Sequence, residues 1–250
     1  MHKKFEIVRR WNLAALLLLA ALPAFSQTVE LKYLPAGQPD GIALLAPPPL
    51  PGSPEQAADL SETISVSKSC PPADAAQAKA EKKFSVFVFT PAIGSFFQSN
   101  SLPKTTAFFE RVRVDSESVT DNAKNFWKRP RPYVVEPSLA NGEPEKSFSY
   151  PSGHSTRATV FALVLVDLFP DRKDEIMAIG RDVGWHRVEI ARHYPTDIYA
   201  GRALAQAIVR EMKANPGFQH DFAEVKSEIA ATRPSLKTAV DTASPIAAHL

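Results

Sequence analysis

Three short segments of the chain concentrate residues that could act on a small anion. The first, residues 124–132, reads KNFWKRPRP and holds four cations. The second is the tetrapeptide PSGH at 151–154, and the third, residues 187–197, reads RVEIARHYPTD. Together they supply lysine, arginine, histidine and aspartate side chains, which are able to bind an anion, transfer protons or act as a nucleophile.

The PSGH segment precedes a strongly apolar run that is predicted to be a helix over residues 154–169. The first N–H groups of a helix have no partner within it, so they point outward and favour an anion. Gly153 has no side chain that would prevent close approach. Ser152, Gly153 and His154 therefore predict an anion pocket at a helix N-terminus.

Lys124 and Arg131 lie seven residues apart, nearly two turns, so an ideal helix would place them on one face. Pro130 and Pro132 prevent a helix from continuing through Arg131. We therefore expect Lys124 to project from a helix end and Arg131 from a stiff extended turn, so that both point at one anion. Because a basic run is usually a solvated surface, this segment predicts a site only together with the other two.

The third segment combines a histidine with an aspartate across a corner. Pro195 disfavours helix at the preceding residue, so the helix predicted over 172–192 ends close to His193. Asp197, four residues on, can then accept the ring N–H, fix the tautomer and stabilise the imidazolium. A lone histidine is more often structural, and His186, His193 and Asp197 could by composition hold a metal, although they form no recognisable ligand motif.

The elements around these segments predict an all-α fold. Thr196 is expected to cap the helix that follows it, and residues 84–89, FSVFVF, could alternatively form a strand. Ten glycines and scarce hairpin signals argue against an all-β fold. The predicted helices cover 55–68, 72–90, 104–128, 154–169, 172–192 and 197–213, and a last helix carries Phe218, Phe222, Val225 and Ile229.

The 250 residues are 44% hydrophobic and 22% charged, which is ordinary for a globular protein. The 29 Lys and Arg against 27 Asp and Glu give a net charge of +2, so bulk electrostatics provide no case for nucleic acid. The single cysteine, Cys70, excludes an intrachain disulfide and a cysteine-based metal site.

The chain is predicted to begin with an export signal. Residues 1–26 hold a basic start and a short apolar run, so we expect cleavage before Gln27 and a periplasmic or secreted protein, with an uncleaved anchor as the alternative. An extended Pro-rich arm is expected over 27–55, because seven of the 22 prolines lie in 35–54.

Within this arm, Ile42, Leu44 and Leu45 are expected to cross the surface of the domain. A single compact helical domain is expected over 56–232, with the active site at its helix ends, followed by a loose tail over 233–250.

The pattern K-x6-R-P, then P-S-G-H, then R-x5-H-x3-D resembles the signature of the type 2 phosphatidic acid phosphatase superfamily. That superfamily includes bacterial class A non-specific acid phosphatases and vanadium haloperoxidases. Only Lys124 has an Arg-Pro pair seven residues on, which favours Arg131 over Arg129. The export signal, the Pro-rich segment and the Ser-Tyr pair before PSGH are similar to the class A enzymes.

The resemblance covers most of residues 40–230, and the sequence departs from the pattern at three positions. Phe148 stands where the class A subgroup tends to have glycine and Tyr194 where it tends to have tryptophan, and His186 stands where the superfamily usually has a serine or alanine-like residue. These changes weaken the assignment to the class A subgroup and, with it, the prediction of a substrate range. For His186 we favour a structural contact over a second acid or base.

The resemblance implies a role for each matching residue. His193 would be the nucleophile that takes the phosphoryl group, Asp197 would orient it, and His154 would be the general acid and then the base. No metal or other cofactor is implied. The phosphate oxygens would be bound by three cations and two backbone N–H groups, from Lys124, Arg131, Arg187, Ser152 and Gly153.

The implied function is a metal-independent acid phosphatase that hydrolyses small phosphomonoesters through a phosphohistidine. An envelope lipid phosphatase with the same mechanism, a vanadate-dependent haloperoxidase and a non-catalytic phosphate-binding module are the alternatives. No segment after the signal reaches roughly 18 apolar residues, so we expect no stable membrane insertion after cleavage. Nucleic acid is not an expected partner, and a homo-oligomer is left open.

Overall fold

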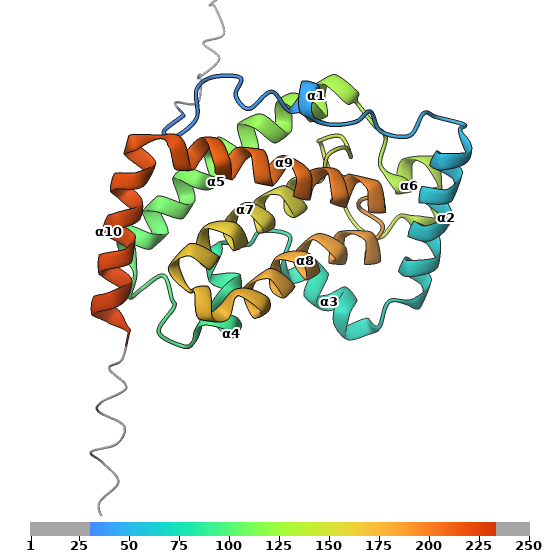
Figure 1. Ribbon diagram of the computed structural model, residues 1–250. Helices are drawn as coiled ribbons and strands as arrows, with labels where there is room; N and C mark the ends of the chain where they lie inside the picture. Colours follow the sequence, from blue (N-terminus) through green and yellow to red (C-terminus); the bar gives the residue numbers. More distant parts are fainter. Residues whose placement is uncertain (1–30, 234–250) are drawn as a thin grey trace, which may run out of the picture. The chain divides into compact units, whose positions relative to one another are not determined.

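A computed structural model describes residues 31–233 of the chain (Figure 1). The predicted export signal at 1–26 and the predicted tail beyond residue 233 lie outside the described residues. Within 31–233 every regular element is helical, which confirms the predicted all-α fold. Among these helices, none is both long and apolar enough to cross a membrane.

The longer helices, apart from the shortened α3, follow the predicted pattern closely. They are α2 (Pro54–Ser69), α3 (Pro72–Ala80), α5 (Pro103–Trp127), α7 (Gly153–Leu168), α8 (Lys173–Glu189), α9 (Pro195–Ala214) and α10 (Pro216–Thr232). The short elements are α1 (Gly41–Leu44), α4 (Thr90–Ile93), α6 (Pro132–Val135) and the 3₁₀ turns η1 (Val86–Phe89), η2 (Pro137–Leu139) and η3 (Pro170–Arg172).

Helix α7 is the central element, packed against α5, α8 and α9 (Figure 1). Its side chains are buried on most of its circumference, which explains why its sequence is apolar rather than amphipathic. Helix α9 packs closely against the N-terminus of α7. A Cβ added at Gly201 of α9 would lie only 2.8 Å from the carbonyl oxygen of Ser152. This contact brings the PSGH segment against the first turns of α9.

The last helix, α10, packs on α5 and α9 through its apolar face. Phe218, Val225 and Ile229 are buried, and Phe222 is partly buried against the same core, as the spacing predicts. The ring of Phe218 packs edge-on against Tyr33, whose hydroxyl donates to Asp221 (2.7 Å). Helix α10 therefore holds the beginning of the Pro-rich segment as well as the core.

The Pro-rich segment is fixed to α5 by a buried carboxylate. The backbone N–H groups of Lys32, Tyr33 and Leu34 all donate to Asp115, at 2.6–3.0 Å. Leu45 is buried but Leu44 is 52% exposed, so only part of the predicted apolar contact forms.

The expectation that the segment holds no helix was wrong over α1. Asp40 caps this one turn by accepting the N–H groups of Ile42 and Ala43, and no proline lies within the turn.

Two further local predictions were wrong. The helix predicted over 72–90 ends at Ala80, and residues 86–89 form a 3₁₀ turn that begins where Ser85 accepts the Phe87 N–H. Burial of Phe84, Val86 and Phe89 outweighs the helical composition of this segment.

Thr196 is not an N-cap: α9 begins at Pro195, after Tyr194. A proline is favoured at the first position of a helix, and the Thr196 hydroxyl bonds Asp59 instead.

Candidate active site

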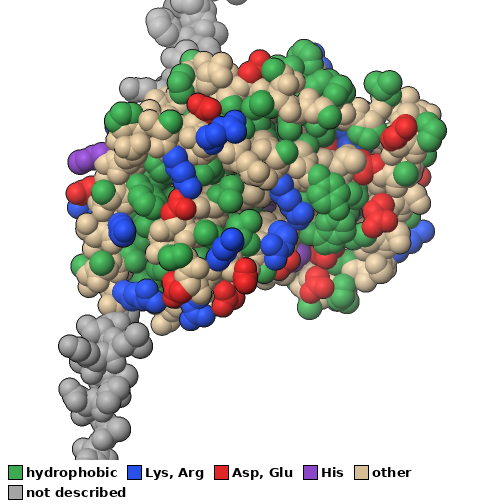
Figure 2. All heavy atoms as spheres, in the orientation of Figure 1, with side chains coloured by type: hydrophobic (Ala, Val, Ile, Leu, Met, Phe, Trp, Pro, Cys, Tyr) green, Lys and Arg blue, Asp and Glu red, His purple; other side chains and the backbone are tan. Residues whose placement is uncertain are grey.

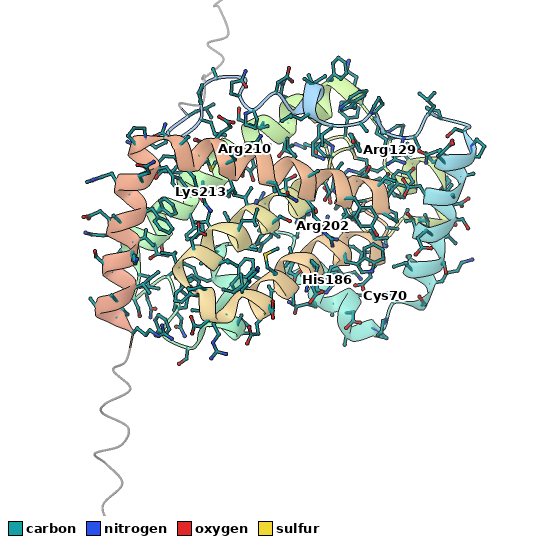
Figure 3. The ribbon with its side chains drawn as sticks, in the orientation of Figure 1. Cys70, Arg129, His186, Arg202, Arg210 and Lys213 are labelled. Carbon is teal, nitrogen blue, oxygen red and sulfur yellow. The ribbon has the colours of Figure 1, made fainter. Side chains whose placement is uncertain are left out.

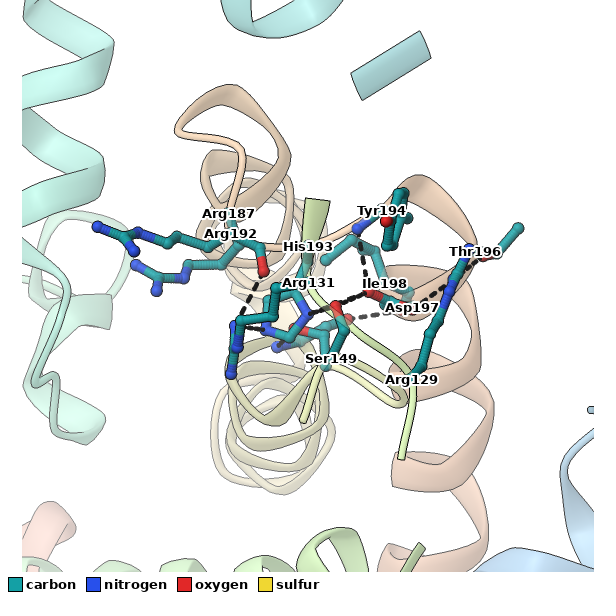
Figure 4. A network of polar contacts seen from close by, with 12 residues as sticks. Arg129, Arg131, Ser149, Arg187, Arg192, His193, Tyr194, Thr196, Asp197 and Ile198 are labelled. Carbon is teal, nitrogen blue, oxygen red and sulfur yellow. Dashed lines mark hydrogen bonds and ion pairs between the residues drawn. The ribbon is translucent and has the colours of Figure 1, made fainter. Parts of the chain in front are cut away.

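His193 lies at a tight corner between α8 and α9, where the sequence predicted it (Figure 4). The chain leaves α8 after Glu189 and passes through Ala191, which takes the left-handed conformation with φ of 50°. The N–H groups of Arg192 and His193 then both donate to the carbonyl of Arg187, at 2.8 and 3.1 Å. This corner fixes the ring of His193 at the N-terminal end of α9.

The imidazole of His193 is oriented by the fully buried carboxylate of Asp197. Its Nδ1 lies 3.2 Å from Asp197 Oδ2, and the Ser149 hydroxyl donates to the same oxygen at 2.6 Å (Figure 4). The Tyr194 N–H is a third donor, at 3.0 Å. Because Asp197 accepts a hydrogen bond from Nδ1–H, Nε2 carries the free lone pair and faces away from the aspartate.

Arg129 is a buried residue of the site, although the motif spacing favoured Arg131 over it. Its guanidinium donates to Asp197 Oδ1 at 2.6 Å (Figure 4). It also donates to Asp59 Oδ2 at 2.7 Å and stacks over the Tyr194 ring. It therefore neutralises two buried carboxylates, one of them the partner of His193. The partner Asp59 lies 70 residues away on α2, so the spacing within the basic run gives no signal for this role.

On the other side of the ring, His193 Nε2 faces cations. Arg131 Nη1 lies 3.3 Å from Nε2, and Arg131 also donates to the carbonyl of Arg192 at 2.8 Å. Lys124 projects from the last turn of α5 and donates to the carbonyl of Phe148 at 2.6 Å. Arg131 follows in extended backbone just before α6, as the two prolines predicted.

A cavity of about 300 Å³ lies beside His193. Most of the predicted site residues line it, and Asp197 lies directly behind His193. The cavity has a further cation that was not predicted, Arg157 on α7. The lining residues named by the motifs are Lys124, Arg131, Gly153, His154 and His193.

The resemblance implied that the backbone N–H of Ser152 binds phosphate, but this N–H already has a partner. It donates to the Asp197 carbonyl at 3.0 Å, and the Ser152 hydroxyl accepts the Ser155 N–H as the N-cap of α7. The Ser152 N–H is therefore not available to an anion in this structure. The first N–H groups of α7 at the cavity are those of Gly153 and His154, which have no partner inside the helix.

Arg187 is buried but does not line the His193 cavity. Its guanidinium pairs with Glu145, and it faces a neighbouring cavity of about 460 Å³. Glu145 lines both cavities and also pairs with Arg131, 2.9 Å from Nη2 to Oε2. No sequence motif predicted Glu145, because it lies in a loop without periodicity.

His186 makes a structural contact, the role that the sequence favoured over that of a second acid or base. Its Nδ1 lies 2.8 Å from the Glu81 carboxylate (Figure 3). The backbone carbonyl of the same Glu81 lies 3.2 Å from His154 Nε2, and the His154 ring packs against Phe84. His186 therefore does not join His193 and Asp197. Within residues 31–233, no three His, Cys, Asp or Glu side chains are grouped so as to hold a metal ion.

Burial, together with the charges of neighbouring cations, shifts the pKa values of the site. Burial, followed by the charge of Arg131, lowers the pKa of Lys124 to about 7. Burial and nearby cations also hold the pKa of His193 and of His154 well below the usual value, with Arg131 and Arg187 the leading charges respectively. A dianion in the cavity would oppose all of these shifts.

Charged side chains of both signs are spread over one face of the molecule. Lys and Arg side chains alternate with Asp and Glu over the face seen in Figure 2. Lys124 and Arg131, the cations that were predicted to bind an anion, are instead buried.

Comparisons with known proteins identify the family of the chain. Residues 114–217 match the profile of the PAP2 superfamily. The acid phosphatase of Zymomonas mobilis is 30% identical over 211 residues, 81% of this chain and 80% of that protein. The chain therefore belongs to the PAP2 superfamily, as the motifs indicated.

Two other proteins are similar over shorter regions. The non-specific acid phosphatase of Salmonella typhi is 30% identical over 148 residues, 57% of this chain, and the match spans only 59% of that protein. The structure of a transmembrane PAP2 type phosphatidylglycerolphosphate phosphatase from Bacillus subtilis is 22% identical, with a TM-score of 0.47, and covers 64% of this chain and 84% of that one.

Proposed function

We propose that the chain is an acid phosphatase that hydrolyses phosphomonoesters through a phosphohistidine at His193, without a metal ion, in the periplasm or outside the cell. The observation that carries this proposal is the content of one cavity. It joins a histidine oriented by a buried carboxylate, a second histidine and two buried cations. Anion binding alone needs only the cations, whereas the two histidines supply a nucleophile and an acid.

In the first step, His193 Nε2 attacks the phosphorus, the N–P bond forms and the P–O bond of the ester breaks. Asp197 stabilises the positive charge that develops on the ring. Lys124 and Arg131 neutralise the phosphoryl oxygens, which is the main requirement of phosphoryl transfer. His154 donates its proton to the leaving oxygen and releases an alcohol.

In the second step, the now neutral His154 accepts a proton from a water molecule. The resulting hydroxide oxygen attacks the phosphorus, the N–P bond breaks, and the electron pair returns to His193 Nε2. Inorganic phosphate leaves with the cations unchanged, and His154 holds the proton needed for the next cycle. Because His154 acts as acid and then as base, the rate is expected to be bell-shaped in pH.

Binding of tungstate, a dianion that mimics phosphate, should weaken as the pH rises through about 7. Lys124, with a pKa of about 7 in the free protein, is charged below this pH and loses its charge above it. We therefore expect the Kd to rise by up to about tenfold per pH unit above 7. Calorimetry between pH 6 and 9 measures this; a constant Kd, or the same break at pH 7 in Lys124→Met, would contradict it.

Hydrolysis of p-nitrophenyl phosphate by residues 27–250, assayed between pH 4 and 8 with a chelator present, tests the proposed function. We expect turnover that the chelator leaves unchanged and that is fastest at acidic pH. No turnover at any pH in this range contradicts the phosphatase, and turnover lost on chelation contradicts metal independence. Parallel assays of micellar phosphatidate and of bromide oxidation with vanadate separate the lipid phosphatase and haloperoxidase alternatives.

A further inference from the structure

We propose that Glu145 is a specificity-determining residue: its carboxylate holds the place of the phosphate between Arg131 and Arg187 until a dianionic substrate displaces it. This inference rests on the proposed function, because it assumes that these two arginines bind a phosphoryl group. It assigns a role to a residue outside the three motifs, in the loop that joins η2 to α7.

The contacts of Glu145 are those expected of a bound anion. One carboxylate oxygen pairs with Arg131 Nη2 at 2.9 Å and the other accepts from Arg187 Nη2. Both guanidinium groups are almost completely buried, whereas the Glu145 side chain is 22% exposed. The carboxylate thus reaches from the protein surface into a site built of desolvated cations, where charge-assisted hydrogen bonds are strong.

Glu145 lies at the border of two neighbouring cavities and occupies the Arg187 guanidinium. The cavity of His193 and His154 lies on one side of Glu145, and the cavity faced by Arg187 lies on the other. The Arg187 guanidinium that pairs with Glu145 would therefore bind an anion at His193 in exchange for this carboxylate. The displaced carboxylate of Glu145 can turn into the second cavity, which is lined by the cations Lys79, Lys82 and Arg192.

The required movement is a change of side-chain rotamer. The loop backbone is held on both sides of Glu145, by Arg192 bonding the carbonyls of Asn141 and Glu143 at 3.0 and 3.1 Å, and by Arg131 bonding the Ser147 carbonyl at 2.9 Å. The side chain itself is partly exposed and has bonds only to the two arginines. It can therefore leave without refolding of the loop.

This arrangement favours one class of ligand over another. A phosphomonoester dianion has two charges and three free oxygens to offer the arginines, more than the single charge and two oxygens of the carboxylate. A phosphodiester has one charge and two free oxygens, so it gains nothing over Glu145. Competition from the carboxylate is therefore expected to select monoesters and to reject diesters.

Tungstate binding by Glu145→Gln at pH 6 tests the proposal, with Glu143→Gln as the matched control. Glu143 lies two residues away in the same loop, and its backbone carbonyl rather than its carboxylate bonds Arg192. We expect the Kd to fall about tenfold in Glu145→Gln, because a competing charge is removed, and to stay within about twofold in Glu143→Gln. We also expect the affinity of the Glu145→Gln variant for bis(p-nitrophenyl) phosphate to rise relative to its affinity for the monoester.

Unchanged or weaker tungstate binding in a folded Glu145→Gln variant would overturn the proposal, because Glu145 would then only hold the arginines in place. If the variant does not fold, a crystal structure of the unmodified protein with tungstate decides the question. We expect tungstate oxygens on both arginines and Glu145 turned away. Tungstate seated with Glu145 still on both arginines overturns the proposal. Neither readout needs turnover, so a failure of the proposed phosphatase activity is recognised separately.

Discussion

Replacing His193 with alanine should lower kcat for p-nitrophenyl phosphate by at least about 10⁴-fold. The variant loses Nε2, which faces Arg131 with a free lone pair while a buried carboxylate holds the other side of the ring. Arg131 and Lys124 remain, so phosphate binding should survive better than turnover. Steady-state kinetics at the acidic optimum, together with tungstate affinity, measure both effects.

The matched control is His220→Ala, which removes an exposed histidine of α10 far along the chain from the motifs. Its kcat should equal that of the unmodified protein. A His193→Ala variant that keeps more than about a tenth of the activity, while melting at the normal temperature, would exclude His193 as the nucleophile.

Arg129→Met should produce the largest loss of stability, about 3–5 kcal/mol in the free energy of unfolding. The guanidinium pairs with Asp59 and Asp197, and all three side chains are at most 4% exposed. Methionine fills a similar volume but leaves two carboxylates buried without a counter-charge. Chemical denaturation at pH 7 measures the loss.

Arg210→Met is the control for this measurement, because Arg210 is 72% exposed and should change stability by no more than about 0.5 kcal/mol. Equal unfolding free energies for the two variants would show that Arg129 does not neutralise Asp59 and Asp197. If Arg129→Met folds, we also expect slower turnover, because the carboxylate that orients His193 loses its partner.

Local sequence was sufficient for the elements that present the site. Prolines 130 and 132 stop α5 before Arg131, and Pro195 starts α9 directly after the His193 corner, so the directions of Lys124, Arg131 and His193 follow from backbone restrictions within a few residues. The apolar composition of α7 likewise predicted a central helix with His154 at its N-terminal end.

Partners distant in sequence were not predictable in this way. The Ser152 N–H is used by the Asp197 carbonyl because α9 approaches α7 closely at Gly201, which is a property of the packed helices. Arg187 is held by Glu145, 42 residues earlier. The helix predicted over 72–90 ended early because burial of aromatic side chains outweighed helix propensity, which is a weak local preference.

The most direct test of the phosphohistidine mechanism is to trap the covalent intermediate. His154→Ala should accumulate it from p-nitrophenyl phosphate, because p-nitrophenolate leaves without a proton whereas the attacking water still needs the base. Alkaline quenching followed by mass spectrometry of peptides should locate one phosphoryl group on His193. Turnover with no phosphorylated peptide, or a phosphoryl group on any other residue, would contradict the mechanism.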